Sequence, residues 1–314
     1  MIVVRNASEL PPAWQGGAVS IGNFDGVHRG HAQIVARLKE LARQLHGPAL
    51  IFTFDPHPAA LLRPDHLPPP LMTLDQKNAA LARLGVDGVW AYPTDLQILQ
   101  RTPTEFFQQF IQSALQAGGM VEGPDFRFGN QRLGDIHLLH QLTSQAQMKL
   151  EVVEPLSHAG AAVSSSRIRT LLQSGNVAAA ADLLGRPYSI AGRVAHGAGR
   201  GATIGFPTAN VGQIATLLPA FGVYAGLAEY LGQCYPAAIH LGPNPTFGEQ
   251  VGKLEVHLLG FQGNLYEQFL TVHFVERIRS VQTFAGRDAL VAQLRLDVAA
   301  SEEIGLAALR QWKW

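Results

Sequence analysis

The chain has 314 residues, 24 basic and 24 acidic side chains and therefore no formal net charge, and 47% of its residues are hydrophobic. This composition predicts folded domains and excludes a disordered chain, and the lack of a basic tract argues against a nucleic-acid partner. No apolar run is long enough to span a membrane, no signal peptide is evident, and the single cysteine, Cys234, excludes an internal disulfide. We therefore expect a soluble, cytoplasmic protein with no membrane partner.

Short apolar runs alternate with amphipathic segments in the first half of the chain. This alternation predicts βαβ units and a mostly parallel sheet, whose ligands bind at the carboxyl ends of the strands. The expected strands are Ala18–Ile21, Ala49–Phe54, Val86–Tyr92, Gly119–Glu122 and Leu150–Val153, and the expected helices are His31–Leu45, Leu74–Leu84, Thr104–Ala117 and Asp135–Gln147.

After Gly185 the pattern changes to strand-like runs separated by turn residues, which predicts an antiparallel sheet or a small closed barrel. The expected strands are Ser189–Ala195, Gly222–Glu229, Pro236–Leu241, Leu254–Leu259 and Phe269–Val275. A helix from Arg287 to about Val298 is expected to complete this part. We place the boundary so that residues 1–184 form an α/β domain and residues 185–314 a β-barrel domain.

The stretch Gly22-Asn-Phe-Asp-Gly-Val-His-Arg-Gly-His31 follows the first core strand and opens a helix. A helix start offers backbone N–H groups and a positive dipole end to an anion, and His28 and His31 share one face there. Gly22, Gly26 and Gly30 allow close approach of the backbone. Taken alone, such a histidine pair is more often plain polar surface, and a metal site lacks a third ligand.

Three later segments are expected at the same edge of the sheet: Thr53–Pro58, Gly123–Gly129 and Ser164–Arg169. The hydroxyls, backbone donors and two arginines of the last segment suit phosphate oxygens. Each segment alone has a structural reading, because Phe126 and Phe128 fit a core and a serine run fits a helix cap.

The ordered motifs G-N-F-D-G-V-H-R-G-H, F-T-F-D-P-H-P, D-F-R-F-G and V-S-S-S-R-I-R resemble the adenylyltransferase domain of bacterial bifunctional FAD synthetases, the riboflavin kinase/FMN adenylyltransferases. The resemblance implies a Rossmann-like nucleotidylyltransferase fold and attack of a nucleophile on the α-phosphate of ATP, with release of pyrophosphate. It implies catalytic roles for His28, His31 and Arg169, nucleotide binding by Gly22, Asn23, Phe24, Asp25, Gly30, Ser164, Ser165 and Ser166, and flavin binding by His57, Asp125 and Phe126.

The second half contains G-R-P-Y-S-I, G-F-P-T-A-N, N-P-T-F and K-L-E-V-H, which look like the riboflavin kinase module of that family. Thr208 and Asn210 alternate with apolar neighbours and offer two oxygens to Mg²⁺, together with ATP phosphates. Glu255 is the only acid of an apolar strand, where a carboxylate is costly unless it is paired or functional. By resemblance Glu255 is the general base, Gly205 binds nucleotide and Asn244 binds flavin.

Several positions depart from the pattern of that family. Ala198 and Ala202 replace residues of the glycine-rich loop, His240 stands for the usual asparagine, Val281 replaces an acidic residue, and Pro124 is unusual before Asp125. The departures at Ala198 and Ala202 affect the nucleotide affinity expected of the kinase domain. There is also no P-loop sequence, so phosphate binding must follow another mode.

The resemblance implies that riboflavin is phosphorylated to FMN with ATP, and that FMN is then adenylylated to FAD with a second ATP. Mg²⁺ is the expected cofactor. We expect a monomer or weak homo-oligomer. One alternative is a riboflavin kinase whose N-terminal domain binds flavin without activity, against which His28 and His31 argue. A flavin-sensing or storage protein would have no use for Glu255, Thr208 and Asn210. A tRNA-linked synthetase fragment would be expected to carry a basic tract.

Overall fold

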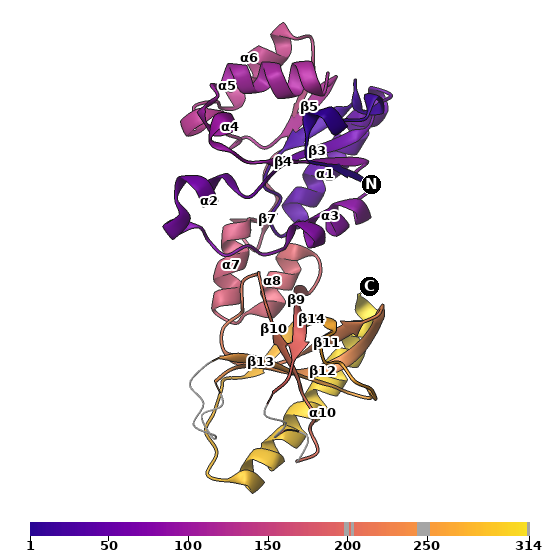
Figure 1. Cartoon of the computed structure of the whole chain (residues 1–314), viewed down its shortest axis with the longest axis vertical. Helices are drawn as coiled ribbons and strands as arrows, with labels where there is room; N and C mark the ends of the chain where they lie inside the picture. Colours follow the sequence, from indigo (N-terminus) through magenta and orange to yellow (C-terminus); the bar gives the residue numbers. More distant parts are fainter. Residues whose placement is uncertain (198–200, 202–203, 244–251, 313–314) are drawn as a thin grey trace. The chain divides into compact units, whose positions relative to one another are not determined.

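The computed structural model describes residues 1–197, 201, 204–243 and 252–312, and the chain divides into two compact units, Met1–Ser164 and Ser165–Trp314 (Figure 1). We call them the first and the second unit. No helix of the described ranges is long and apolar enough to cross a membrane.

The first unit is built on a six-stranded sheet in the order β1-β4-β3-β2-β5-β6. The strands are β1 (Ile2–Val4), β2 (Ala18–Ile21), β3 (Ala49–Asp55), β4 (Gly88–Pro93), β5 (Gly119–Glu122) and β6 (Lys149–Val152). Neighbouring strands run parallel. The order reverses between β2 and β5, which makes the carboxyl ends of these two strands the switch point of the sheet.

Helices cover both faces of this sheet (Figure 1). The helices α1 (Arg29–Gln44) and α3 (Leu74–Arg83) pack on one face, while α5 (Pro103–Phe106), its π-helical continuation η4 (Phe107–Ala114) and α6 (Ile136–Gln145) pack on the other. Burial on both faces explains why the central strands are continuous apolar runs. The shorter elements are η1 (Ala7–Glu9), η2 (Pro12–Trp14), α2 (Pro58–Leu62), η3 (Pro64–His66), α4 (Leu96–Gln100), η5 (Asn130–Arg132), β7 (Ser157–His158) and β8 (Ala161–Ala162).

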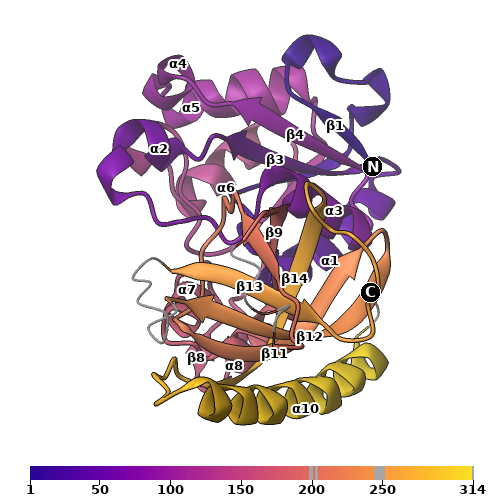
Figure 2. The same ribbon diagram turned by 60° about the horizontal axis from the view of Figure 1, so that its bottom comes forward.

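The second unit begins with α7 (Ser165–Gln173) and α8 (Val177–Leu184), which pack on each other, and α8 also packs on the barrel that follows. The barrel is closed, antiparallel and six-stranded, in the order β10-β13-β12-β11-β14-β9. Its strands are β9 (Tyr188–Ala195), β10 (Ala209–Gly212), β11 (Gly222–Tyr230), β12 (Gln233–Gly242), β13 (Lys253–Leu258) and β14 (Phe269–Arg279). The helix α10 (Arg287–Gln311) lies along the barrel, mainly against β11 and β12 (Figure 2).

The fold class predicted from the sequence is confirmed, with two corrections to its elements. The strand β10 was not expected, because it is short and follows directly on a Pro-containing loop. The last helix does not end near Val298 but continues to Gln311. Its second half buries small residues, Ser301, Gly305 and Ala308, and a Cβ at Gly305 would lie 2.8 Å from Pro236 Cβ, so the helix packs without a broad apolar stripe. The domain boundary at 184/185 stays a prediction.

Candidate active sites

The switch point of the first unit lies directly beside two of the predicted motifs. Gly22–His31 follows β2, and Gly123–Gly129 follows β5, the strand paired with β2 on the other side of the reversal. The carboxyl ends of parallel strands meet at one edge of a sheet, so both loops leave the sheet at the same edge.

His28 is the N-cap of α1, and its Nδ1 accepts a hydrogen bond from the His31 backbone N–H at 3.3 Å. Because Nδ1 accepts, the neutral ring carries its proton on Nε2, where it can donate to a ligand. The rings of His28 and His31 are stacked, with centroids 3.7 Å apart. A Cβ at Gly30 would lie 3.2 Å from the His28 ring, so glycine lets this ring lie over the helix start.

Asn23 joins the first motif to the second. Its side-chain Nδ2 lies 2.8 Å from Nε2 of His57, which follows β3 and caps α2 through Nδ1. The Oδ1 atom of Asn23 is buried and has no hydrogen-bond partner among the described residues. Buried polar atoms are nearly always paired, so this oxygen fits a hydrogen-bond donor from a bound water or ligand.

The contacts of Phe24 and Asp25 stabilise the loop between β2 and α1. Phe24 is 3% exposed and packs on His31, with ring centroids 5.0 Å apart. Both carboxylate oxygens of Asp25 accept the backbone N–H of Leu71, at 3.0 and 3.1 Å. These contacts fix the shape of the loop that leads to His28.

In the third motif, Gly123–Gly129, the two predicted flavin-binding residues differ in their surroundings. Asp125 is exposed, whereas Phe126 is half-buried and stacks on Phe128 at 5.4 Å between centroids. Phe128 adjoins Phe106, and through it an aromatic cluster on the α5 side of the sheet. Pro124 lies between Gly123 and Asp125 in a turn closed by the Phe126 N–H and the Gly123 carbonyl.

The serine–arginine motif lies where the two units join in sequence. Ser164 ends the first unit, and Ser165, Ser166 and Arg169 belong to α7 in the second. Arg169 is half-buried and Ser166 is exposed. That this motif lies close to His28 and His31 stays a prediction.

Two buried ionisable residues of the first unit, Glu122 and Lys77, lie outside the predicted motifs. Glu122 ends β5 at the switch point and is 2% exposed, and its Oε1 accepts the Ile21 backbone N–H at 2.7 Å. Burial raises the pKa of this carboxyl well above its ordinary value. Lys77 on α3 is 9% exposed, and burial lowers the pKa of its ammonium group. The sequence signal for Glu122 is an acidic residue at the end of an apolar strand. Lys77 lies in a polar stretch of α3 and has no such signal.

In the second unit, three predicted or singled-out residues form a row across neighbouring strands. Asn210 on β10 is the register partner of Glu255 on β13, and Glu255 is the partner of His240 on β12. Residues directly opposite in antiparallel strands point to the same face. The structure thus brings Asn210, Glu255 and His240 together.

The loop before β10 packs closely around the two proposed metal ligands. A Cβ at Gly197 would collide with the Asn210 amide, and one at Gly201 would lie 3.4 Å from Thr208 Oγ1. The ring Nδ1 of His257 lies 2.6 Å from the Pro207 carbonyl oxygen and so ties the loop to β13. Neutral oxygens beside a carboxylate suit Mg²⁺, which keeps waters and phosphate oxygens as its other ligands. The donor set therefore fits Mg²⁺.

A cavity of about 370 Å³ adjoins this row and includes Asn210 in its lining. Its other lining residues include Gly197, Leu241 and Lys253. Gly205, predicted to bind nucleotide, is exposed and has a φ of +89° in the loop before Thr208. Asn244, Ala198 and Ala202 lie outside the described residues. Within the described ranges no group of three or more His, Cys, Asp or Glu side chains could hold a metal ion.

Two family models match the chain, "FAD synthetase" over residues 10–167 and "Riboflavin kinase" over residues 184–304. Relatives called bifunctional riboflavin kinase/FMN adenylyltransferase include one from Pseudomonas fluorescens, 36% identical over 97% of this chain and 98% of the relative. The relative from Escherichia coli K12 is 37% identical over 98% of this chain and 99% of the relative. The one from Bacillus subtilis is 35% identical over 89% of each.

A solved crystal structure described as a macrolide-efflux protein from Streptococcus pneumoniae matches this chain with a TM-score of 0.86. It is 31% identical and covers 99% of both chains, so it shares the fold of this chain. With two family models matched in sequence and curated relatives aligned over nearly their whole length, the chain belongs to the bifunctional riboflavin kinase/FMN adenylyltransferases.

Proposed function

We propose that this chain phosphorylates riboflavin with ATP to give FMN, and then adenylylates FMN with a second ATP to give FAD and pyrophosphate. The observation that carries the proposal is that two polar features of different kinds lie in different units of one chain. The first is a histidine-capped helix start at a sheet switch point, and the second is a carboxylate beside an amide on the barrel. We assign the adenylyltransferase to residues 1–184 and the kinase to residues 185–314.

In the kinase step Glu255 acts as the general base. It takes the proton from the 5′-hydroxyl of riboflavin, whose oxygen attacks the γ-phosphate of ATP and releases ADP. Thr208 and Asn210 would hold Mg²⁺, which when bound neutralises charge on the phosphates. Gly205 would bind the nucleotide, and Asn244 would bind the flavin. The assignment is supported by the register of the barrel, in which Glu255 and Asn210 are direct partners on neighbouring strands.

In the adenylyl step the phosphate of FMN attacks the α-phosphate of ATP, and pyrophosphate leaves. The nucleophile is already ionised, so the site needs donors more than a base. His28, His31 and Arg169 would stabilise the transition state and pyrophosphate, and the position of His28 as the N-cap of α1 supports this role. The nucleotide would be bound by Gly22, Asn23, Phe24, Asp25, Gly30, Ser164, Ser165 and Ser166, and the flavin by His57, Asp125 and Phe126.

The substrates are thus riboflavin, FMN and ATP, with Mg²⁺ as cofactor, in a cytoplasmic monomer or weak homo-oligomer. Incubation with riboflavin, ATP and Mg²⁺, with the flavins separated over time, tests the proposal. FMN followed by FAD is expected. FMN alone would select a kinase whose N-terminal domain is inactive, and unchanged riboflavin would contradict both activities.

A further inference from the structure

Lys77 is a buried lysine that the proposed chemistry does not use. It lies on α3, is 9% exposed, and its Nζ donates to Oγ1 of the fully buried Thr53 at 3.5 Å, a long contact. Lysines are almost never this buried unless they are paired. Removing an ammonium group from water is costly, so neighbouring negative charge must compensate it.

Two carboxylates supply that charge. Burial lowers the pKa of Lys77, and the charges of Asp25 and Asp55 act in the opposite direction. Asp25 belongs to the loop after β2 and Asp55 ends β3, so Lys77 couples to two of the motif loops at the carboxyl edge of the sheet. Asp25 also accepts the Leu71 N–H, just before the helix that carries Lys77. The hydrogen bond from Leu71 to Asp25 therefore ties the loop after β2 to the start of the α3 region, and the charge of Lys77 acts on the same carboxylate.

The loop that Asp25 holds has an unfavourable backbone. Phe24 has a φ of 47° and Val27 a φ of 37°, with Gly26 at 83° between them. A β-branched residue at positive φ costs on the order of 1–3 kcal/mol and persists only when its surroundings enforce it. His28, the next residue, is the N-cap of α1. The conformation of residues 24–27 therefore sets the position of the His28 ring and of the helix start.

We propose that Lys77 is a positioning residue for adenylyl transfer: through Asp25, its buried ammonium holds the loop 22–28 in the form that presents His28 and the start of α1 to the nucleotide phosphates. This inference rests on the proposed adenylyltransferase activity. In this proposal, Asp25 stabilises the conformation of the loop 22–28.

The test measures both reactions of the full chain carrying Lys77→Met. Methionine keeps the volume and burial of the side chain but removes the charge. Asp25 and Asp55 are only half-buried, so the loss of folding stability is expected to be smaller than for a fully buried pair, and thermal unfolding measures it. FMN adenylylation is expected to fall about 10²-fold, the effect of a displacement near 1 Å at a reacting centre. Riboflavin phosphorylation, assigned to the second unit, is expected to be unchanged.

Two further variants separate positioning from simple packing. Lys77→Arg keeps the charge and is expected to recover most of the adenylylation lost in Lys77→Met. Lys39→Met is the matched control, since this exposed lysine of α1 donates to the Leu84 carbonyl oxygen at 2.9 Å, away from the motif loops. It is expected to adenylylate FMN at the wild-type rate. If Lys77→Met does not fold, Lys77→Gln, also uncharged but still able to reach Thr53, replaces it.

Three outcomes would overturn the proposal. One is wild-type adenylylation in Lys77→Met, and another is a loss that only follows the folded fraction measured by thermal unfolding. Failure of Lys77→Arg to recover more activity than Lys77→Met is the third. A wild-type chain that makes FMN but no FAD would instead refute the adenylyltransferase function, and the inference with it.

Discussion

His240 on β12 and Glu255 on β13 are direct partners across two antiparallel strands, and Asn210 on β10 is the partner of Glu255 on its other side. The Nε2 atom of His240 is buried and has no hydrogen-bond partner within the described ranges. Burial lowers the pKa of the His240 ring, and the charge of Glu255 opposes this shift. On the two neighbouring strands, the proposed general base therefore has an imidazole whose burial favours its neutral form on one side and an amide on the other.

Glu255→Gln is expected to lower kcat for riboflavin phosphorylation by about 10²–10⁴-fold, because glutamine fills the same space but cannot accept the proton. Adenylylation of added FMN is expected to stay at the wild-type rate. Chromatography of the flavins, with riboflavin or FMN as the starting substrate, measures the two steps separately. Glu267→Gln, at a carboxylate exposed elsewhere in the second unit, is the matched control. Wild-type phosphorylation by Glu255→Gln would exclude Glu255 as the base.

His28→Ala is expected to lower kcat for FAD formation by about 10²–10³-fold while FMN still accumulates, because a donor to developing charge is lost. The change also removes the N-cap of α1, which costs about 0.5–2 kcal/mol. His28→Asn separates the two effects, since asparagine caps a helix well but lacks the ring Nε2. Normal FAD formation by His28→Asn would show that the cap, rather than the ring, is what the reaction requires.

The placement of the motifs could be predicted because it follows from local rules. Strands buried on both faces, such as Ala49–Asp55, are continuous apolar runs, and parallel strands bring the loops at their carboxyl ends to one edge. The predicted meeting of the first and second motifs is confirmed by the contact between Asn23 and His57.

The remaining features depend on tertiary contacts that no local pattern reveals. Lys77 belongs to a polar stretch of α3 and resembles any surface lysine in the sequence, but the fold buries it beside Thr53, within the electrostatic influence of Asp25 and Asp55. The far half of α10 packs through Ser301 and Gly305, which carry little hydrophobic signal. The register that puts His240 beside Glu255 depends on barrel closure, which propensity does not encode.

Glu122→Gln is expected to change how stability depends on pH. In the folded chain the pKa of Glu122 is raised well above 4.5 by burial, so above 4.5 the folded state binds more protons than the unfolded one. The stability from this group is complete below 4.5 and is lost as the pH rises through the folded pKa. Glutamine cannot ionise and still accepts the Ile21 N–H, so the variant gains stability over wild type as the pH rises.

Thermal unfolding followed by tryptophan fluorescence measures this difference in the first unit, because Trp14 and Trp90 are buried there. The gap between variant and wild-type midpoints is expected to widen from mildly acidic to alkaline pH. Glu154→Gln, at an exposed carboxyl of the same unit, is the control and is expected to give no widening. A gap for Glu122→Gln that is constant with pH would mean that Glu122 is ionised in the folded chain.

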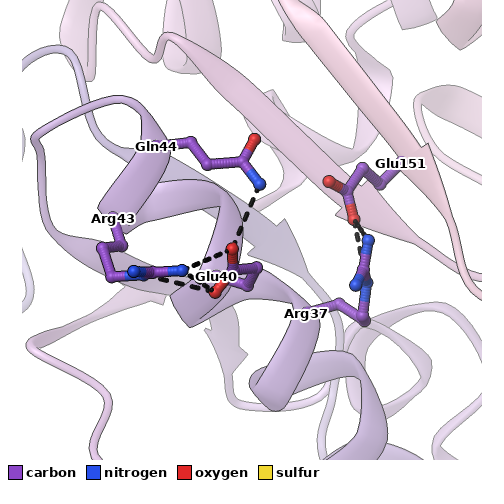
Figure 3. Close-up of polar contacts among 5 residues, drawn as sticks. All are labelled: Arg37, Glu40, Arg43, Gln44 and Glu151. Atoms are coloured by element: carbon purple, nitrogen blue, oxygen red, sulfur yellow. Dashed lines mark hydrogen bonds and ion pairs between the residues drawn. The ribbon is translucent and has the colours of Figure 1, made fainter.

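Arg279→Met and Arg37→Met are expected to differ sharply in their cost to stability. Arg37 pairs with Glu151 at 2.8 Å on the surface of the first unit, near the Glu40–Arg43 pair (Figure 3), and exposed pairs contribute about 0–1 kcal/mol. Arg279 reaches Asp297 at 2.6 Å, where the aspartate is 1% exposed. Removing this arginine leaves a buried carboxylate uncompensated and is expected to cost about 3–5 kcal/mol.

The double variant Arg279→Met/Asp297→Leu tests whether that cost comes from charge. Replacing both members of a buried pair with apolar residues is often neutral, so much of the stability lost in Arg279→Met should return. Urea unfolding of the three variants, followed by circular dichroism, supplies the comparison. If the double variant were no more stable than Arg279→Met, the loss would come from packing between β14 and α10, and the ion pair would contribute little to the attachment of that helix.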